Sequence, residues 1–97
     1  MKVTVKYFTT LREITGMREE LVEVEEGTTI LQLMQKLAEK HGIEFKKYVF
    51  DNENTPKDFL QFLIDGQSTT TMKGNDTELR EGVKVAIIPP VGGGQQI

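Results

Sequence analysis

The sequence predicts an α+β fold, in which a mixed sheet of four to five strands packs on one main helix. Apolar and polar residues alternate near both ends of the chain, which is typical of half-buried strands. A single apolar stripe at helical spacing lies between these segments. With 97 residues, the chain is long enough for one domain and too short for a second.

Residues 1–8 predict the first strand, because their side chains alternate between an apolar and a mixed face. The apolar face carries Val3, Val5 and Tyr7. The mixed face carries Lys2, Thr4, Lys6 and Phe8. Residues 20–24 predict a second strand, and the connection over residues 11–17 turns at Gly16. Because the gap between the two strands is short, we expect an antiparallel hairpin.

The clearest helix signal lies in the next segment of the chain. Thr29 followed by Gln32 matches a capping box, in which each residue satisfies a backbone N–H of the other. The apolar stripe then consists of Ile30, Leu33, Met34, Leu37 and Ala38. His41 suits the negative end of the helix dipole, an interpretation that we prefer to a catalytic role. Gly42 is a natural stop for the helix.

The second half of the chain predicts the remaining strands. Residues 59–64 are strongly apolar and end at an Asp-Gly turn, so they predict a third strand. Residues 67–76 are typical of a polar loop with a short edge strand, and residues 83–88 alternate as the last strand. Residues 43–58 combine aromatic residues with a polar turn and give no clear prediction.

The resulting order, β–β–α–β–(short β)–β, describes the β-grasp, or ubiquitin-like, architecture. We expect the first and last strands to lie side by side at the centre of the sheet, with the helix packed across one face. The other face should be open. Strand alternation places Phe8 and Ile88 on that open face.

Composition disfavours several functional classes. A net charge of −3 with scattered basic residues argues against nucleic-acid binding, which needs a concentrated basic face. The absence of cysteine removes disulfides, iron–sulfur clusters, thiolate metal sites and cysteine nucleophiles. A chain of this size leaves no room for a large enclosed active site. No apolar run approaches the roughly 20 residues that span a bilayer, so we expect a cytoplasmic protein with no membrane contact. We also expect no bound metal or cofactor.

Glutamates gather around the second strand. They are Glu19, Glu20, Glu23, Glu25 and Glu26. The simplest interpretation is a solvated edge of the sheet, and the alternative is electrostatic steering toward a basic partner.

The end of the chain is the most informative part of the sequence. The last strand is followed by Pro89-Pro90-Val91-Gly92-Gly93-Gly94 and then by Gln95-Gln96-Ile97. Prolines hold the next segment off the body, and three glycines bury nothing, so they suit a tail that enters another protein's narrow channel. We predict a domain over residues 1–91 and a flexible glycine-rich tail over residues 92–97.

Several short motifs occur in the order seen in one family. They are Tyr7-Phe8 with Leu11-Arg12-Glu13 and Gly16, Gly27-Thr28-Thr29, Asp65-Gly66, Leu79 with Gly82, and Ala86 through Gly94. The chain closely resembles the MoaD/ThiS sulfur carriers, particularly the small subunit of molybdopterin synthase. The Pro-Pro-Val-x-Gly-Gly ending is the most specific part of this resemblance.

This resemblance implies a carrier or accessory subunit rather than an enzyme with catalytic side chains of its own. A ubiquitin-activating-type adenylating enzyme would use ATP to activate the carboxylate of Gly94, and persulfide sulfur would displace AMP. The thiocarboxylate would then deliver sulfur inside the large subunit of molybdopterin synthase. Gly92 and Gly93 would give the tail its clearance. The docking residues that the resemblance implies are Phe8, Arg12, Ile88, Pro90 and Val91.

The three residues after Gly94 depart from the family's pattern. In the encoded chain the carbonyl of Gly94 is held in a peptide bond to Gln95, so it cannot be adenylated. Either a tail-processing protease removes residues 95–97, or this copy is inactive as a carrier. Two other functions stay open: a ubiquitin-like modifier joined through Gly94 to lysines of target proteins, and a ubiquitin-like interaction module that is never activated.

Overall fold

A computed structural model describes residues 1–90, and residues 91–97 lie outside this description. The strands of the main sheet are β1 (Lys2–Lys6), β2 (Glu19–Glu23), β5 (Gln61–Ile64), β6 (Gln67–Ser68) and β7 (Lys84–Ile88). The helices are α1 (Thr10–Thr15), α2 (Ile30–His41) and α3 (Ile43–Val49), with 3₁₀ turns η1 (Thr69–Thr71) and η2 (Gly74–Asp76). A separate small hairpin pairs β3 (Phe50–Asn52) with β4 (Thr55–Pro56).

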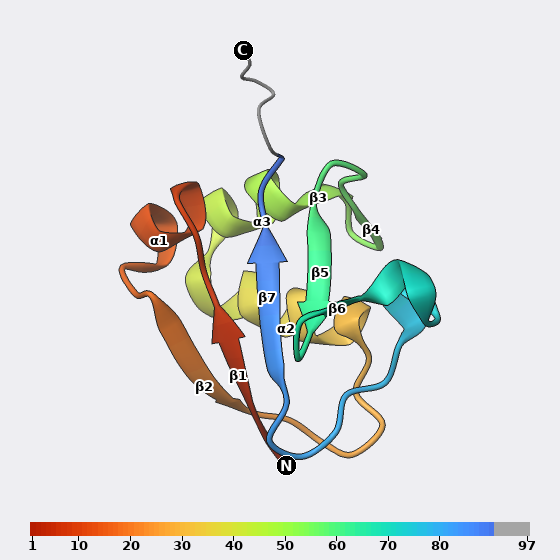
Figure 1. Cartoon of the computed structure of the whole chain (residues 1–97). Coiled ribbons are helices and arrows are strands. Elements are labelled where there is room, and N and C mark those ends of the chain that lie inside the picture. Colours follow the sequence, from red (N-terminus) through yellow and green to blue (C-terminus); the bar gives the residue numbers. More distant parts are fainter. Residues whose placement is uncertain (91–97) are drawn as a thin grey trace.

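The sheet has the strand order β2-β1-β7-β5-β6, which confirms the predicted β-grasp fold. The parallel pair β1 and β7 lies at its centre, with Val5 opposite Val85. The neighbouring pairs β1–β2 and β5–β7 are antiparallel. In Figure 1 the helices α2 and α3 lie behind the sheet, and its near face carries no helix. The predicted division into a covered and an open face is therefore confirmed.

The core fills the space between the sheet and α2. The strand residues that alternate inward are buried, as the sequence predicts: Val3, Val5, Tyr7, Val83, Val85 and Ile87. From the helix, Ile30, Leu33, Met34 and Leu37 are buried against them, while Ala38 is half-buried. Leu79 is also buried. Each fully buried side chain of this kind contributes about 1.5–3 kcal/mol to the free energy of unfolding.

The start of α2 has the predicted capping box. The hydroxyl of Thr29 accepts the backbone N–H of Gln32 at 3.2 Å, and the side chain of Gln32 accepts the N–H of Thr29 at 3.0 Å. At the other end, Gly42 has φ 96° and ψ −166°, and α3 begins immediately after it. This backbone conformation is essentially restricted to glycine, although it is not the left-handed helical stop that the sequence suggests.

Two segments differ from the sequence prediction. Residues 11–17 were expected as a simple connection, but α1 forms there and ends at Gly16 in the left-handed conformation. Residues 43–58, which gave no clear prediction, form α3 and the β3–β4 hairpin. Both helices are short, and α1 buries only Leu11 of its own residues, so neither shows a helical period long enough to recognise.

Replacing Thr29 with Ala should lower the free energy of unfolding by about 0.5–2 kcal/mol, because the backbone N–H of Gln32 in the first turn of α2 loses its side-chain acceptor. Urea denaturation measures this loss. Thr10→Ala is the matched control, since Thr10 is exposed and no hydrogen bond of its side chain is seen among the described residues. Equal losses in the two variants would contradict a specific capping role.

Candidate functional site

The open face of the sheet carries a cluster of half-buried apolar side chains, which we call the apolar patch. It consists of Phe8, Leu63, Ala86 and Ile88. Ala86 lies between Lys6 of β1 and Leu63 of β5, and Ile88 pairs with Gln61. Phe8 continues the alternation of β1 beyond Lys6, with buried Tyr7 on the opposite side. The predicted placement of Phe8 and Ile88 on one open face is thus what the structure shows.

Helix α1 places a cation over the patch. The guanidinium carbon of Arg12 lies 5.5 Å from the centroid of the Phe8 ring, within the range of a cation–π contact. Its Nε also donates a hydrogen bond of 3.1 Å to the carbonyl of Tyr7, which fixes the side chain against the end of β1. Two residues that the resemblance marks for docking therefore lie together.

The patch lies where the described chain ends. Lys6 of β1 lies opposite Ala86 of the parallel strand β7. Phe8 and Ile88 each come two residues later, so they lie at the same end of the two central strands. Pro89 is half-buried and Pro90 is exposed. The other predicted site residues, Val91 and Gly92 through Gly94, lie outside the described residues.

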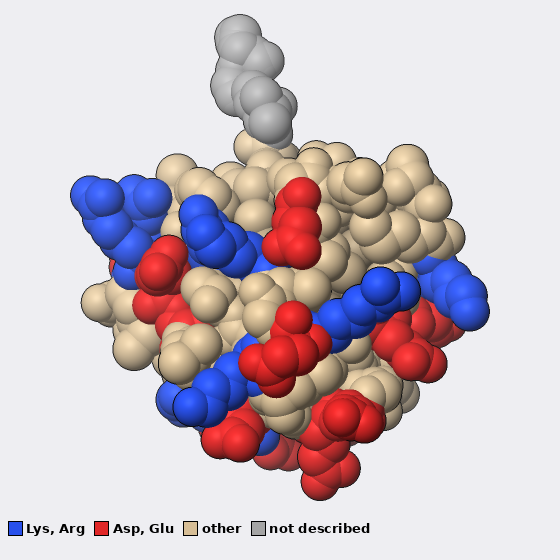
Figure 2. Space-filling view, turned by 60° about the horizontal axis from the view of Figure 1, so that its bottom comes forward, with Lys and Arg blue, Asp and Glu red and all other residues tan. Residues whose placement is uncertain are grey.

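Charged side chains of both signs are spread over most of the face seen in Figure 2, with an acidic one a short way below the end of the described chain, whereas the surface immediately beside that end is uncharged. Such a surface binds through apolar contact rather than through a strong electrostatic field. It is therefore suited to a protein partner.

A buried polar cluster on the covered side of the sheet was not predicted. Glu20 is only 6% exposed, and its Oε1 accepts a 2.7 Å hydrogen bond from the hydroxyl of Tyr7. Nε2 of His41 donates to the same oxygen at 2.8 Å, and the ammonium of Lys40 pairs with Oε2. The His41 ring stacks on Phe45 with centroids 5.6 Å apart. This cluster joins β1, β2 and the end of α2.

The cluster corrects two interpretations made from the sequence. Glu20 does not belong to a solvated acidic edge, and His41 does more than compensate the helix dipole, because it holds a buried carboxylate. Strand parity contains the missing signal: Glu20 alternates with Val22 and Val24, which are both buried.

The electrostatics of the cluster favour a charged Glu20 beside a neutral Tyr7. Burial alone would raise the pKa of the Glu20 carboxyl, but the hydrogen bonds from Lys40, Tyr7 and His41 outweigh it and hold that pKa below its ordinary value. Burial, the hydrogen bond to Glu20 and its negative charge together raise the pKa of Tyr7 far above its ordinary range. The cluster thus has structural rather than acid–base character.

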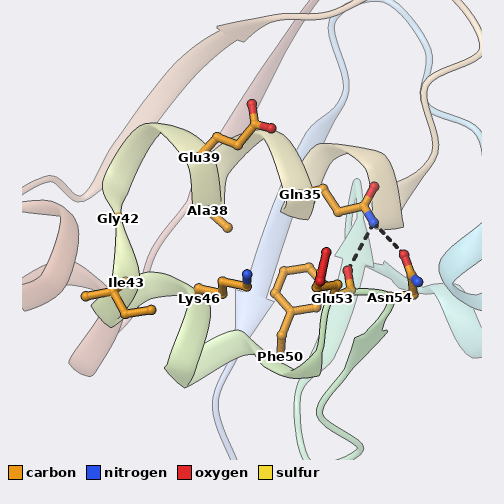
Figure 3. Close-up of a pocket in the computed structure, with 9 residues that line it drawn as sticks. All are labelled: Gln35, Ala38, Glu39, Gly42, Ile43, Lys46, Phe50, Glu53 and Asn54. Atoms are coloured by element: carbon orange, nitrogen blue, oxygen red, sulfur yellow. Dashed lines mark hydrogen bonds between the residues drawn. The ribbon is translucent and has the colours of Figure 1, made fainter.

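A shallow hollow of about 440 Å³ lies on the opposite side of the molecule, between α2, α3 and the β3–β4 hairpin (Figure 3). The side-chain amide of Gln35 donates there to the carbonyl of Glu53 and to Oδ1 of Asn54, both at 3.1 Å. These bonds tie the hairpin to α2. The described residues that line the hollow include no Ser, Thr, Cys or His.

Two further findings concern residues 1–90 only. Within them, no three side chains of His, Cys, Asp or Glu are grouped so that they could hold a metal ion. None of the helices in this part of the chain is long and apolar enough to cross a bilayer.

A mixed sheet of this topology, backed by one long helix, defines the ubiquitin-like β-grasp class of proteins. Residues 5–94 match the ThiS family, and the chain belongs to that family. The resemblance to MoaD/ThiS carriers is therefore confirmed.

Three similar proteins illustrate the range of this family. Small archaeal modifier protein 3 of Haloferax volcanii is 26% identical over 94 residues, which are 97% of this chain and 100% of the relative. A solved structure from Pyrococcus furiosus, provisionally named molybdopterin converting factor, subunit 1, is 31% identical with a TM-score of 0.74, over 93% of this chain and 98% of that one. SAMP1 of Haloferax volcanii supports the fold alone, with 24% identity and a TM-score of 0.80 over 97% and 100% of the two chains.

These findings define the protein as a ubiquitin-like sulfur carrier or a modifier of the small archaeal modifier type. Its family is one of small carrier proteins rather than of catalytic enzymes.

Replacing Glu20 with Gln should lower the free energy of unfolding at pH 7 by about 1–3 kcal/mol, because the buried donors Tyr7 and His41 lose a charged acceptor. The pKa of Glu20 is lowered by folding, so its contribution is present above its ordinary value of 4.5 and is lost as pH falls through the folded-state pKa. The difference between the wild type and Glu20→Gln should therefore shrink below about pH 4.

Denaturant unfolding at pH 7 and at pH 3 measures both effects. Glu19→Gln is the matched control, because Glu19 is the exposed neighbour of Glu20 on the same strand. A constant difference at both pH values would show that the ionised carboxylate does not stabilise the fold.

Proposed function

We propose that this protein is a sulfur carrier of the molybdopterin-synthase small-subunit type, which carries sulfur as a thiocarboxylate on Gly94 after residues 95–97 are removed. The observation that carries the proposal is that two features lie at the same end of the central strands. The apolar patch lies at this end, and the chain leaves the sheet there toward Gly92-Gly93-Gly94.

The chemistry uses the terminus of the chain rather than a side chain. Hydrolysis of the Gly94–Gln95 bond first releases the Gly94 carboxylate. One carboxylate oxygen then attacks the α-phosphorus of ATP in the partner's active site, which forms the acyl adenylate and releases pyrophosphate. Persulfide sulfur attacks the acyl carbon and expels AMP, and reduction of the resulting acyl disulfide by a thiol leaves the thiocarboxylate.

The energetics explain why such a tail needs a docking surface. The six residues from Pro89 to Gly94 span at most about 20 Å when extended. Ordering three glycine backbones costs on the order of 3–6 kcal/mol in total, so the tail is a poor source of affinity. Burying Phe8 or Ile88 fully on a partner contributes about 1.5–3 kcal/mol each, which offsets that cost.

A carrier of this type works with three partners and holds no resident cofactor. They are a ubiquitin-activating-type adenylating enzyme, the large subunit of molybdopterin synthase and a tail-processing protease. ATP is bound and used by the adenylating enzyme. Support for a synthase partner comes from the Pyrococcus furiosus neighbour, whose name describes it as one subunit of a converting factor.

The second candidate function is protein modification, in which the activated Gly94 acyl group is transferred to lysine ε-amino groups of target proteins. The specific observation in its favour is the match to small archaeal modifier protein 3 over the full length of that relative. Both functions share the adenylation step and the same docking surface.

Chains that end at Gly94, at Gly93 and at Ile97 should differ sharply with the adenylating enzyme. Only the chain ending at Gly94 should support ATP–pyrophosphate exchange. The full-length chain lacks a glycine carboxylate, and the chain ending at Gly93 falls about 3.5 Å short of the reacting phosphorus. ATP–pyrophosphate exchange with the unprocessed chain that ends at Ile97 would contradict the proposal.

The mass of the protein isolated from its own organism separates carrier from modifier. Loss of residues 95–97 together with exchange of one oxygen for sulfur supports the carrier. Loss of these residues with ladders of larger, target-linked species supports the modifier. A full-length mass in every preparation leaves only the interaction module.

Replacing Ile88 with Lys should weaken binding to the adenylating enzyme by about tenfold or more, because a half-buried docking side chain becomes charged. The fold should persist, since Ile88 lies outside the buried core. Ile43→Lys is the matched control: Ile43 is 62% exposed on α3, in the helix layer. Calorimetric titration measures binding, and equal affinity of the two variants would exclude the apolar patch as the docking surface.

A further inference from the structure

The outer edge of β2 is unpaired within the described residues. β2 is the terminal strand of the sheet, and its only strand partner there is β1. In Figure 1 β2 forms the left border of the sheet, with no ribbon beyond it. The opposite border is β6, which has only two residues and offers little backbone for pairing. β2 is therefore the edge at which another strand can be added.

The register of β2 shows which backbone groups are free. The N–H of Tyr7 donates to the carbonyl of Arg18, and the N–H of Val24 donates to the carbonyl of Met1. Hydrogen-bonded pairs alternate in an antiparallel ladder, so Glu20 and Val22 also face β1. Arg18, Glu20, Val22 and Val24 therefore direct their backbone groups toward β1. The backbone N–H and C=O groups of the alternate residues point outward: Glu19, Leu21 and Glu23.

The side chains of these three residues form a distinct pattern on the open face. Leu21 is 63% exposed, between the exposed carboxylates of Glu19 and Glu23. On β1, Lys6 lies opposite Glu19 and Lys2 lies opposite Glu23. The ion pairs seen in the described part of the chain nevertheless involve Glu20 instead. Glu19 and Glu23 are thus free to pair with an incoming strand.

We propose that the outer edge of β2 binds an extended basic segment of a partner protein as an added strand. Residues of that segment opposite Glu19 and Glu23 are Lys or Arg, and the residue opposite Leu21 is apolar. The recognised pattern is basic–x–apolar–x–basic, and it reads the same in parallel and antiparallel orientation. Backbone hydrogen bonds to Glu19, Leu21 and Glu23 give affinity, and the side-chain pairs give specificity.

Charge argues against a second copy of this chain as the occupant. A two-fold pairing of β2 with itself, centred on Leu21, would place Glu19 of each copy directly opposite Glu23 of the other. Like charges directly across a strand pair destabilise it, so the two glutamates protect the edge from self-association. The same glutamates attract a basic strand.

The intervening positions of the added strand face the α2 side of the edge. Lys40 lies there, with its ammonium on Glu20 and its side chain 55% exposed. A basic residue at these positions would be repelled by Lys40. Thr suits them, because it is uncharged and favours extended backbone.

The test uses the full chain and two synthetic peptides, Lys-Thr-Val-Thr-Lys and Glu-Thr-Val-Thr-Glu, each with blocked ends. We expect the basic peptide to shift the amide NMR signals of β2 and to slow hydrogen exchange at Leu21. The acidic peptide should do neither. Shifts confined to another surface, or equal binding of both peptides, would overturn the proposal, as would concentration-dependent shifts of β2 without peptide.

Two variants test the roles of charge and backbone separately. The double variant Glu19→Lys with Glu23→Lys should bind the basic peptide about tenfold more weakly than the wild type does, and it should bind the acidic peptide instead. Leu21→Pro removes one outward N–H without removing a hydrogen bond to β1, so the sheet should persist while peptide binding is lost. If Leu21→Pro unfolds the chain, the charge-reversed variant alone decides: unchanged peptide preference would overturn the proposal.

Discussion

The parallel pairing of β1 with β7 is the constraint on which the rest of the structure depends. These strands come from opposite ends of the described chain and are joined at the centre of the sheet, with Val5 opposite Val85. Their inward residues form the middle of the core. Their outward residues lie on the open face, which ends in Phe8 and Ile88 side by side. A slip by one residue would turn Ile88 into the core and Ile87 out of it, so packing energy fixes the position of the apolar patch.

The two faces of the sheet perform different work. The covered face holds the apolar core and the cluster of Tyr7, Glu20 and His41. An apolar replacement of such a cluster is often as stable, so its contribution lies in connecting defined positions on β1, β2 and α2. The open face, in contrast, keeps half-buried and exposed apolar side chains that the fold itself does not need. Those side chains are available to partners.

The sequence was sufficient where a pattern extends over many residues. α2 shows a full capping box and a stripe of apolar residues over three turns, and the central strands alternate without interruption. α1, α3 and the β3–β4 hairpin are too short for such a period, and contacts distant in sequence decide their conformation. For example, the side chain of Gln35 on α2 holds the β3–β4 hairpin through Glu53 and Asn54, which lie 18 and 19 residues further along the chain.

The candidate site shows the same division. Strand parity placed Phe8 and Ile88 correctly, because parity is a local property of a strand. The expectation for Glu20 was wrong because the run of glutamates suggested solvent exposure, although the parity of the strand indicated the buried face. The partners Tyr7, Lys40 and His41 make its burial favourable. The pairing of Arg12 with Phe8 was likewise beyond sequence reasoning.

The open face offers a partner two kinds of contact that reinforce each other. The apolar patch lies on β1, β7 and β5, and the free edge of β2 is the next strand of the same sheet. A partner that engages the patch brings its neighbouring segments to β2 at high effective concentration, so even a weak added strand would raise the overall affinity. A glycine tail lacks side chains and cannot distinguish one narrow channel from another. Under the proposed function, selection among adenylating enzyme, synthase subunit and target protein would therefore come from this face, through the shape of the patch and the charge pattern of the β2 edge.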